Sequence, residues 1–263
     1  MGSNPTKISK QWADSPFAII ETPRKRRGTC SHTSKAHGAI NAAAEMCLVH
    51  NTLIRHLNCI YLQAPNVKLD KDIADFTTFI HAWCIILEGH HHYEETLFFP
   101  WLEEYIGIEN YMGKNIEQHH AFAPGLKELE DYATALKSGK ETFDGANVQK
   151  IIDNFGPILT QHLREEVESL EALEKFGDKI NWVAWSKRVS DHAVKNADKD
   201  LAVPLFITNI DFSFEAPIHE SAWPPWPWFV GVLFRWVYIA RRKDTCRFSS
   251  CDSYGMPKEL EFV

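Results

Sequence analysis

The chain has 263 residues, of which 44% are hydrophobic and 24% are charged, a balance typical of a globular protein with a substantial core. A net charge of −7, without a basic face interleaved with aromatic residues, argues against a nucleic-acid partner. The chain does not open on an apolar signal-like segment, and its six cysteines do not resemble a disulfide framework. We therefore expect a cytoplasmic protein, and we leave open whether Cys246 and Cys251 pair.

The first part of the chain is predicted to be an extended arm followed by a long helix. Residues 1–33 are polar, contain three prolines and show no sustained hydrophobic period, which indicates an arm without regular structure. The hydroxyls of Thr33 and Ser34 are suitable N-caps for a helix that is predicted to end at Gln63. His50 falls on the apolar stripe of this helix.

Three further long helices are predicted. In residues 70–105, apolar side chains recur every three or four positions along one face. A third helix begins near Asn110, with a kink or a local break expected at Pro124, and a fourth covers residues 144–176. Four long helices joined by short polar links predict an all-α fold, an up-down-up-down four-helix bundle over residues 34–176.

The last part of the chain, residues 177–263, differs in composition. A weaker fifth helix is predicted at about 179–201, followed by a stretch rich in proline and tryptophan. This stretch is too short for a membrane span, and Arg235 interrupts it. Two interpretations remain: a helix that contacts a membrane surface through its aromatic residues, or an extension that packs on the bundle. We expect the second.

Histidine and glutamate recur four residues apart, a spacing that places both side chains on one face of a helix. The three pairs are His90 with Glu94, His91 with Glu95, and His162 with Glu166. About one such pair is expected by chance, so the excess alone decides little. Each of the four predicted helices, however, offers a histidine within its apolar stretch. Imidazole beside carboxylate suits a divalent metal such as iron or zinc, which favours one metal site inside the bundle over four hydrogen-bonded core histidines.

Four short motifs resemble the hemerythrin-like, or HHE cation-binding, family, in particular its longer fungal forms. They are "VHN", "HHHYEETLFFP", "EQHHAF" and "QHLREE", one on each predicted helix, and the closing "CDSYGMPKELEF" is similar to the tail of the fungal forms. The resemblance implies a diiron site in the bundle. Matched residue by residue, it implies these metal ligands: His50, His90, Glu94, His119, His162 and Glu166.

The chain departs from the family motifs at two positions. Hemerythrins carry a second histidine four residues after the first on the third helix, where this chain has Ala123. We expect one of two consequences. Either the missing histidine is replaced by His91, Glu95 or His120, or one metal retains an open coordination position, which a catalytic site requires. Hemerythrins also carry an aspartate at the position of Val167, so the fourth-helix carboxylate is expected from the preceding glutamate.

These features predict a non-haem protein with two irons; a single iron or a zinc ion is the fallback. The main hypothesis is an oxidase or oxygenase that activates dioxygen to act on a small organic substrate. The alternative is a non-catalytic protein that binds O₂ or NO, or that stores or senses iron. A third interpretation is a helical interaction module whose core histidines are satisfied by hydrogen bonds. The sequence offers no other catalytic motif.

Overall fold

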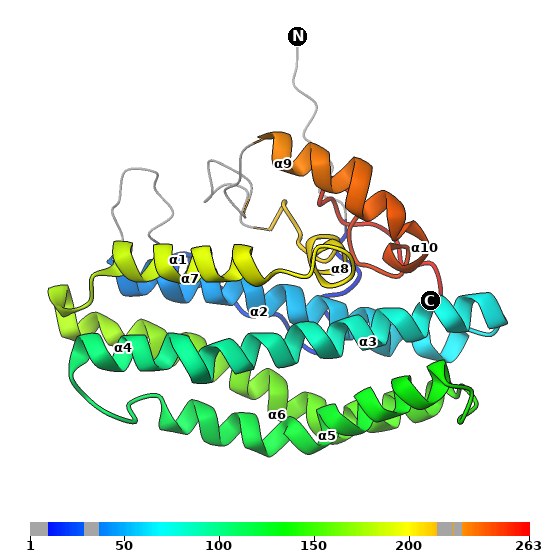
Figure 1. The fold of residues 1–263 in the computed structure, drawn as a ribbon, viewed down its shortest axis with the longest axis horizontal. Coiled ribbons are helices and arrows are strands. Elements are labelled where there is room, and N and C mark those ends of the chain that lie inside the picture. Colours follow the sequence, from blue (N-terminus) through cyan, green and yellow to red (C-terminus); the bar gives the residue numbers. More distant parts are fainter. Residues whose placement is uncertain (1–9, 29–36, 215–222, 224–227) are drawn as a thin grey trace, which may run out of the picture.

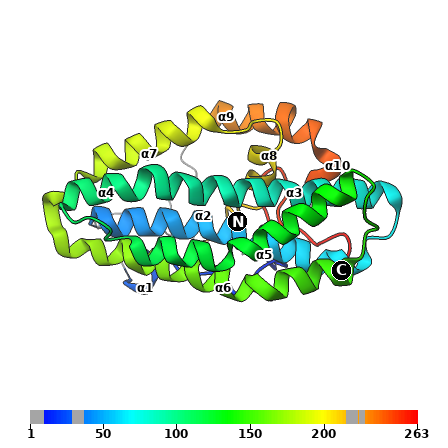
Figure 2. The ribbon, with the colours of Figure 1, turned by 60° about the horizontal axis from the view of Figure 1, so that its bottom comes forward.

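Four long helices lie side by side with alternating direction and form an up-down-up-down bundle (Figure 1; Figure 2). The protein is described from a computed structural model over residues 10–28, 37–214, 223 and 228–263. The bundle helices are α2 (Gly38–Gln63), α3 (Asp70–Tyr93), α5 (Gly113–Lys137) and α6 (Gly145–Glu171). The described residues form no β-strand, and the predicted all-α bundle is confirmed.

The apolar stripe of α3 supplies much of the bundle core. Phe76, Phe79, Trp83 and Leu87 follow the helical spacing and are all fully buried. Burying one such side chain contributes about 1.5–3 kcal/mol. The indole N–H of Trp83 donates a hydrogen bond to the carbonyl oxygen of Leu53 on α2 at 3.0 Å, so this polar atom is satisfied inside the core.

The predicted second helix changes its winding after Tyr93. A π-helical turn, η2 (Glu94–Phe98), follows α3 directly and leads into α4 (Phe99–Ile106). The N–H of Phe99 donates to the carbonyl oxygen of Glu94, five residues earlier. Pro100 has no N–H to donate, which favours a change of hydrogen-bond pattern at this point. The turn lies within the "HHHYEETLFFP" motif.

The local break offered as one possibility at Pro124 does not occur, because α5 continues to Lys137. The ring of Pro124 lies on the exposed face of α5, while Phe122 and Leu126 on either side of it are buried. Packing therefore holds the helix together across the missing hydrogen bond. The predicted N-caps Thr33 and Ser34 lie outside the described residues, and the capping side chain at the start of α2 is His37.

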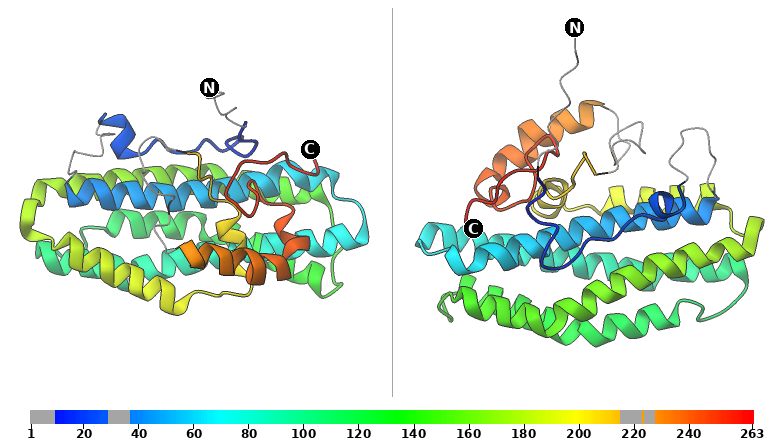
Figure 3. Two further views of the ribbon diagram at one scale, coloured as in Figure 1. Left: turned by 90° about the horizontal axis from the view of Figure 1, so that it is seen from above. Right: turned by 180° about the vertical axis from the view of Figure 1, so that it is seen from behind.

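The N-terminal arm runs along α2 before the short helix α1 (Pro23–Arg26), as Figure 3 shows. Asn51 of α2 pairs with the backbone of Ile20, accepting from its N–H at 2.7 Å and donating to its carbonyl oxygen at 2.8 Å. Asn58 bonds the backbone of Phe17 in the same way, at 2.9 and 2.8 Å. Side-chain amides thus replace the partners that an extended backbone lacks.

The C-terminal extension lies across α2 and α3 (Figure 1; Figure 3). Its elements are η3 (Ala172–Lys179), α7 (Trp182–Asn196), α8 (Ala202–Ile207), α9 (Trp228–Leu233), η4 (Phe234–Ile239) and α10 (Lys243–Cys246). Phe248 is fully buried, with its ring centroid 5.0 Å from that of Phe76 and 5.8 Å from that of Phe79. The extension therefore completes the core on this side of the bundle.

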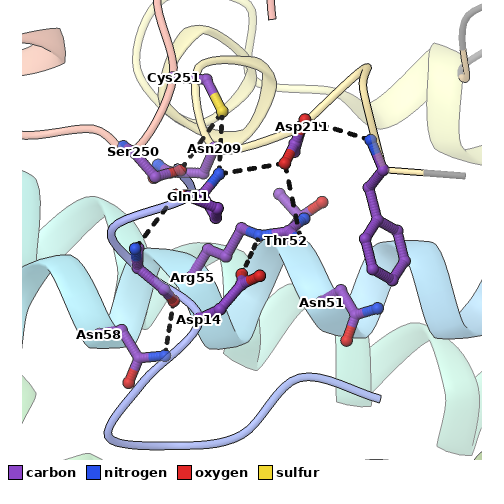
Figure 4. Close-up of polar contacts among 12 residues, drawn as sticks. Gln11, Asp14, Asn51, Thr52, Arg55, Asn58, Asn209, Asp211, Ser250 and Cys251 are labelled. Atoms are coloured by element: carbon purple, nitrogen blue, oxygen red, sulfur yellow. Dashed lines mark hydrogen bonds and ion pairs between the residues drawn. The ribbon is translucent and has the colours of Figure 1, made fainter. Parts of the chain in front are cut away.

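A buried arginine joins the arm, α2 and the C-terminal extension (Figure 4). Arg55 of α2 is 2% exposed, and its Nε donates to Oδ1 of Asp14 in the arm at 2.7 Å. Its Nη2 lies 4.0 Å from Oδ2 of Asp211, which accepts from the Gln11 side chain at 3.3 Å. The three segments thus meet at one charged group.

The cysteines answer one question that the sequence left open, whereas the aromatic stretch leaves the question of contact with a membrane surface open. Cys246 and Cys251 are both free thiols, so they do not pair. None of the helices in the described ranges is long and apolar enough to cross a membrane. Phe229, Leu233 and Trp236 of the aromatic stretch are exposed, so contact with a membrane surface stays an alternative to packing on the bundle.

Candidate metal centre

Five histidines and two glutamates from all four bundle helices converge in the middle of the bundle. Their ligand atoms form two groups, and within each group all atoms lie within 4.8 Å of one another. The first group is His50 (α2), His90 (α3), Glu94 (η2) and Glu166 (α6), and the second is His91 (α3), His119 (α5) and His162 (α6). All six residues that the sequence predicted as ligands are therefore brought together.

The imidazoles face one another across each group. Nε2 of His50 lies 3.1 Å from Nε2 of His90, and Nε2 of His119 lies 3.0 Å from Nε2 of His162. The side chain of His90 is 11% exposed and the other three are 4% exposed or less. Two imidazole sets inside one core, with their Nε2 atoms turned inward, can each bind a metal ion.

The two carboxylates lie between the imidazole sets. Oε1 of Glu94 is 2.9 Å from Nε2 of His90, and its Oε2 is 3.6 Å from Nε2 of His119. Oε2 of Glu166 is 3.5 Å from Nε2 of His50 and 3.6 Å from Nε2 of His162. Each carboxylate therefore reaches both sets, the position that a bridging ligand occupies.

Neither carboxylate accepts a hydrogen bond from the described part of the chain. Glu94 and Glu166 are fully buried, and none of their four oxygens has hydrogen-bond geometry to a donor among the described residues. A buried ionised carboxylate without a partner is strongly disfavoured. A bound cation would supply the missing partner, so the donor set and its orphaned oxygens fit a metal.

Burial changes the protonation state of the whole cluster. It lowers the pKa of His90 to about 4 and that of His162 to about 2, and these imidazoles are neutral at neutral pH. Burial raises the pKa of both carboxyls well above their usual range, and the charge on Glu94 raises that of Glu166 further. Neutral imidazole is the metal-binding form, whereas the carboxyls must release protons when a metal binds.

The outer nitrogens of three histidines are held by the surrounding protein. Nδ1 of His50 lies 2.7 Å from the carbonyl oxygen of Leu163, and Nδ1 of His119 lies 2.7 Å from Oε1 of Glu95. Nδ1 of His162 lies 3.2 Å from Oε1 of Gln118. Such contacts fix the ring orientation and the tautomer of a metal-binding histidine.

The secondary candidates divide into different positions. Glu95 contacts the outer nitrogen of His119 and does not belong to either group of inner ligand atoms. His120 is exposed on α5. His91 is 6% exposed and belongs to the second group. Sequence spacing had paired His91 with Glu95, but η2 begins between them and separates their roles.

Aromatic side chains surround the centre, and a separate cavity, whose lining includes none of the seven centre residues, lies between α2 and α7. The ring of Phe122 packs 5.0 Å from His91 and 5.5 Å from His162, between centroids. Phe98 of η2 contacts Trp185 of α7 at 6.4 Å. Trp185 and Trp182 line a cavity of about 770 Å³ between the start of α2 and α7. Both indole N–H groups are buried without an acceptor among the described residues.

The outer-nitrogen partners Leu163 and Gln118 and the aromatic side chains around the centre were not predicted from the sequence. Gln118 directly precedes His119, and its helical position points it at His162 on the neighbouring helix. Phe122 reads as an ordinary core residue in the sequence. Neither Gln118 nor Phe122 belongs to a recognisable sequence motif for its role. Predicting these roles would require knowing how α5 packs on α6.

Two comparisons with known proteins agree with this geometry. The chain is 31% identical, over 99% of its own length and 97% of the relative's, to the "Dimeric xanthone biosynthesis cluster protein R11" of Cryptosporiopsis sp. (strain 8999). No solved structure matches the chain. The sequence model of the "Hemerythrin HHE cation binding domain" matches residues 41–173, which contain every residue of the two groups. The chain belongs to the hemerythrin HHE cation-binding family.

Proposed function

We propose that the centre holds two iron ions and that the protein uses them to activate dioxygen on a small organic substrate. The single observation that carries this proposal is the pair of buried, unsatisfied carboxylates, Glu94 and Glu166, each lying between two sets of neutral imidazoles. The proposed ligands are those that the sequence predicted: His50, His90, Glu94, His119, His162 and Glu166.

Iron held by these residues would supply the electrons that reduce dioxygen. The protein contributes a fixed arrangement around it. Glu94 and Glu166 release their protons when the site is loaded, because burial keeps these carboxyls protonated in the metal-free state. Leu163, Glu95 and Gln118 hold the histidine rings in place through their outer nitrogens.

The substrate part of the proposal rests on the cavity and on the relative. The relative's name refers to the biosynthesis of dimeric xanthones, which are aromatic ketones. The cavity lined by Trp182 and Trp185 has a volume suited to a small organic molecule. Trp185 also contacts Phe98 on the same π-helical turn as Glu94. We propose a phenolic or ketonic aromatic compound as the substrate.

The free cysteines bear on the compartment. Cys59, Cys84, Cys246 and Cys251 are buried and form no disulfide. Buried free thiols are typical of reducing surroundings. We propose a cytoplasmic location.

The alternative function is reversible binding of O₂ or NO without catalysis. The apolar wall favours it, because Phe122 and Phe99 pack against His119 with centroid distances of 6.0 and 6.1 Å. Such a wall admits a diatomic ligand more easily than a large one. The two functions differ in the fate of the bound O₂, which is released unchanged in one and reduced in the other.

The experiment measures iron content first and then oxygen consumption. Protein loaded with Fe(II) under nitrogen and freed of excess metal is expected to hold about two irons per chain. Exposure to oxygen with an aromatic phenol and a reductant should then give continuous oxygen uptake and an oxidised product. Oxygen binding that reverses under vacuum, without product, would favour the alternative. No stoichiometric metal in a folded protein would contradict both functions.

A matched variant controls for iron that is bound elsewhere. In Glu166→Gln the carboxylate is replaced by a neutral amide of nearly the same shape, so the stoichiometric iron should be lost. Glu168→Gln changes an exposed glutamate on the same helix and should leave iron binding unchanged. Equal iron content in the two variants would show that the metal lies outside the proposed centre.

A further inference from the structure

Helix α5 contributes only one histidine to the centre. The family motif places a second histidine four residues after His119, where this chain has Ala123. Ala123 is exposed, so this position does not face the centre. The neighbouring Phe122 is 2% exposed, and its ring contacts His119 and His162. Helix α5 therefore leaves the second group one imidazole short of the family pattern.

His91 fills that place from another helix. Its ring centroid lies 4.3 Å from that of His119 and 5.3 Å from that of His162. Its ligand atom lies within 4.8 Å of theirs. His90, the preceding residue, instead faces His50 and Glu94 in the first group. Consecutive residues on α3 thus serve different halves of the centre, because a helix turns by about 100° per residue.

The inner nitrogen of His91 has no hydrogen-bond partner among the residues that the structure describes. Its side chain is 6% exposed, and Nε2 is buried without a hydrogen bond to any described residue. His56, a buried histidine outside the centre, shows the usual arrangement, with Nε2 at 3.2 Å from the carbonyl oxygen of Phe79. Buried polar atoms are normally paired, so the bare nitrogen of His91 is an exception that requires an explanation.

We propose that His91 is the third imidazole ligand of the second metal ion, in place of the histidine that α5 lacks. This assignment rests on the proposed function, because it needs a metal in the centre. The two halves of the centre, here called half-sites, then differ in their number of imidazole ligands. The first half-site has two, His50 and His90, and the second has three, His91, His119 and His162. Glu94 and Glu166 lie between them. A half-site with three imidazoles needs no compensating ligand from Glu95 or His120.

The test compares His91→Ala with His92→Ala. His92 is the adjacent residue on the same helix, carries the same side chain and is exposed, so it is a matched control. Each variant is loaded with Fe(II) and its iron is counted. Wild type and His92→Ala are expected to hold about two irons per chain, and His91→Ala about one. Added imidazole should restore the second iron, because it can occupy the space that the side chain leaves.

A measurement on the unaltered protein covers the case in which His91→Ala does not fold. In protein loaded with Co(II) and labelled with ¹⁵N-histidine, five histidines are expected to show large paramagnetic shifts, one of them His91. Four shifted histidines without His91 would overturn the proposal, as would two tightly held irons in a folded His91→Ala. A wild-type protein that binds no metal would refute the proposed function itself. This result can be distinguished from the outcomes that overturn only the assignment of His91.

Discussion

Replacing Glu166 with leucine is predicted to stabilise the metal-free protein, although the residue lies in the proposed metal centre. Glu166 is fully buried and neither of its oxygens accepts a hydrogen bond from the described residues. A buried polar group left unsatisfied costs about 1–3 kcal/mol, so its removal should raise the free energy of unfolding by that amount. If Glu166 instead formed a structural ion pair with His50, whose Nε2 lies 3.5 Å away, its replacement would lower the free energy of unfolding by about 3–5 kcal/mol.

The assay is urea unfolding of chelator-treated protein, followed by circular dichroism, with and without added Fe(II). Metal at a hundred times its dissociation constant should stabilise the wild type by about 2.7 kcal/mol, and Glu166→Leu far less. Glu168→Leu, an exposed change on the same helix, should alter the free energy of unfolding by less than about 0.5 kcal/mol. A destabilised metal-free Glu166→Leu would refute the reasoning, because the carboxylate would then serve the fold.

Three further predictions concern residues around the centre and its supports. Arg55→Met leaves Asp211 without its buried cation and should lower the free energy of unfolding by about 3–5 kcal/mol in urea titrations; a loss below about 1 kcal/mol would contradict it. Burial lowers the pKa of His56 to about 3. Because this folded-state pKa lies below the unfolded value of 6.5, the stability from neutral His56 is present above pH 6.5 and is lost as the pH falls towards 3. The loss in free energy of unfolding should reach about 2 kcal/mol at pH 5. In His56→Leu, the decrease in the free energy of unfolding between neutral pH and pH 5 should be smaller by that amount. Glu95→Gln keeps an oxygen near His119 but removes the charge, so competition with a chelator should show iron binding weakened by roughly 10- to 100-fold; unchanged affinity would exclude a role for the carboxylate.

The sequence predicts the bundle well because helices repeat. On α3, the spacing of Phe76, Phe79, Trp83 and Leu87 specifies one buried face, and the structure buries all four. The spacing of His90 and Glu94 places them on the same stripe. Convergence of the six predicted ligands then follows from antiparallel packing of four such stripes, which is why a local pattern sufficed.

The roles of His91 and Glu95 could not be predicted in the same way. Four-residue spacing pairs them on one helical face, but it does not specify which neighbouring side chain each of them meets in the bundle. The structure places His91 in the second ligand group and Glu95 against the outer nitrogen of His119. The spacing along one helix does not determine these contacts, because they depend on how α3 and η2 pack against α5; a π-helical turn such as η2 is itself frequent at functional sites.

The segments outside the bundle help to offset the free-energy cost of burying the polar residues of the centre in the core. Five imidazoles, four of them buried and one half-buried, and two buried carboxyls occupy positions that apolar side chains would otherwise fill, which weakens the apolar packing between the four helices. The arm and the extension add contacts to the outer faces of α2 and α3, through Asn51, Arg55 and Phe248. These contacts do not depend on a metal. Because they fix α2 and α3 from outside, they help to hold His50, His90 and His91 in position independently of a metal.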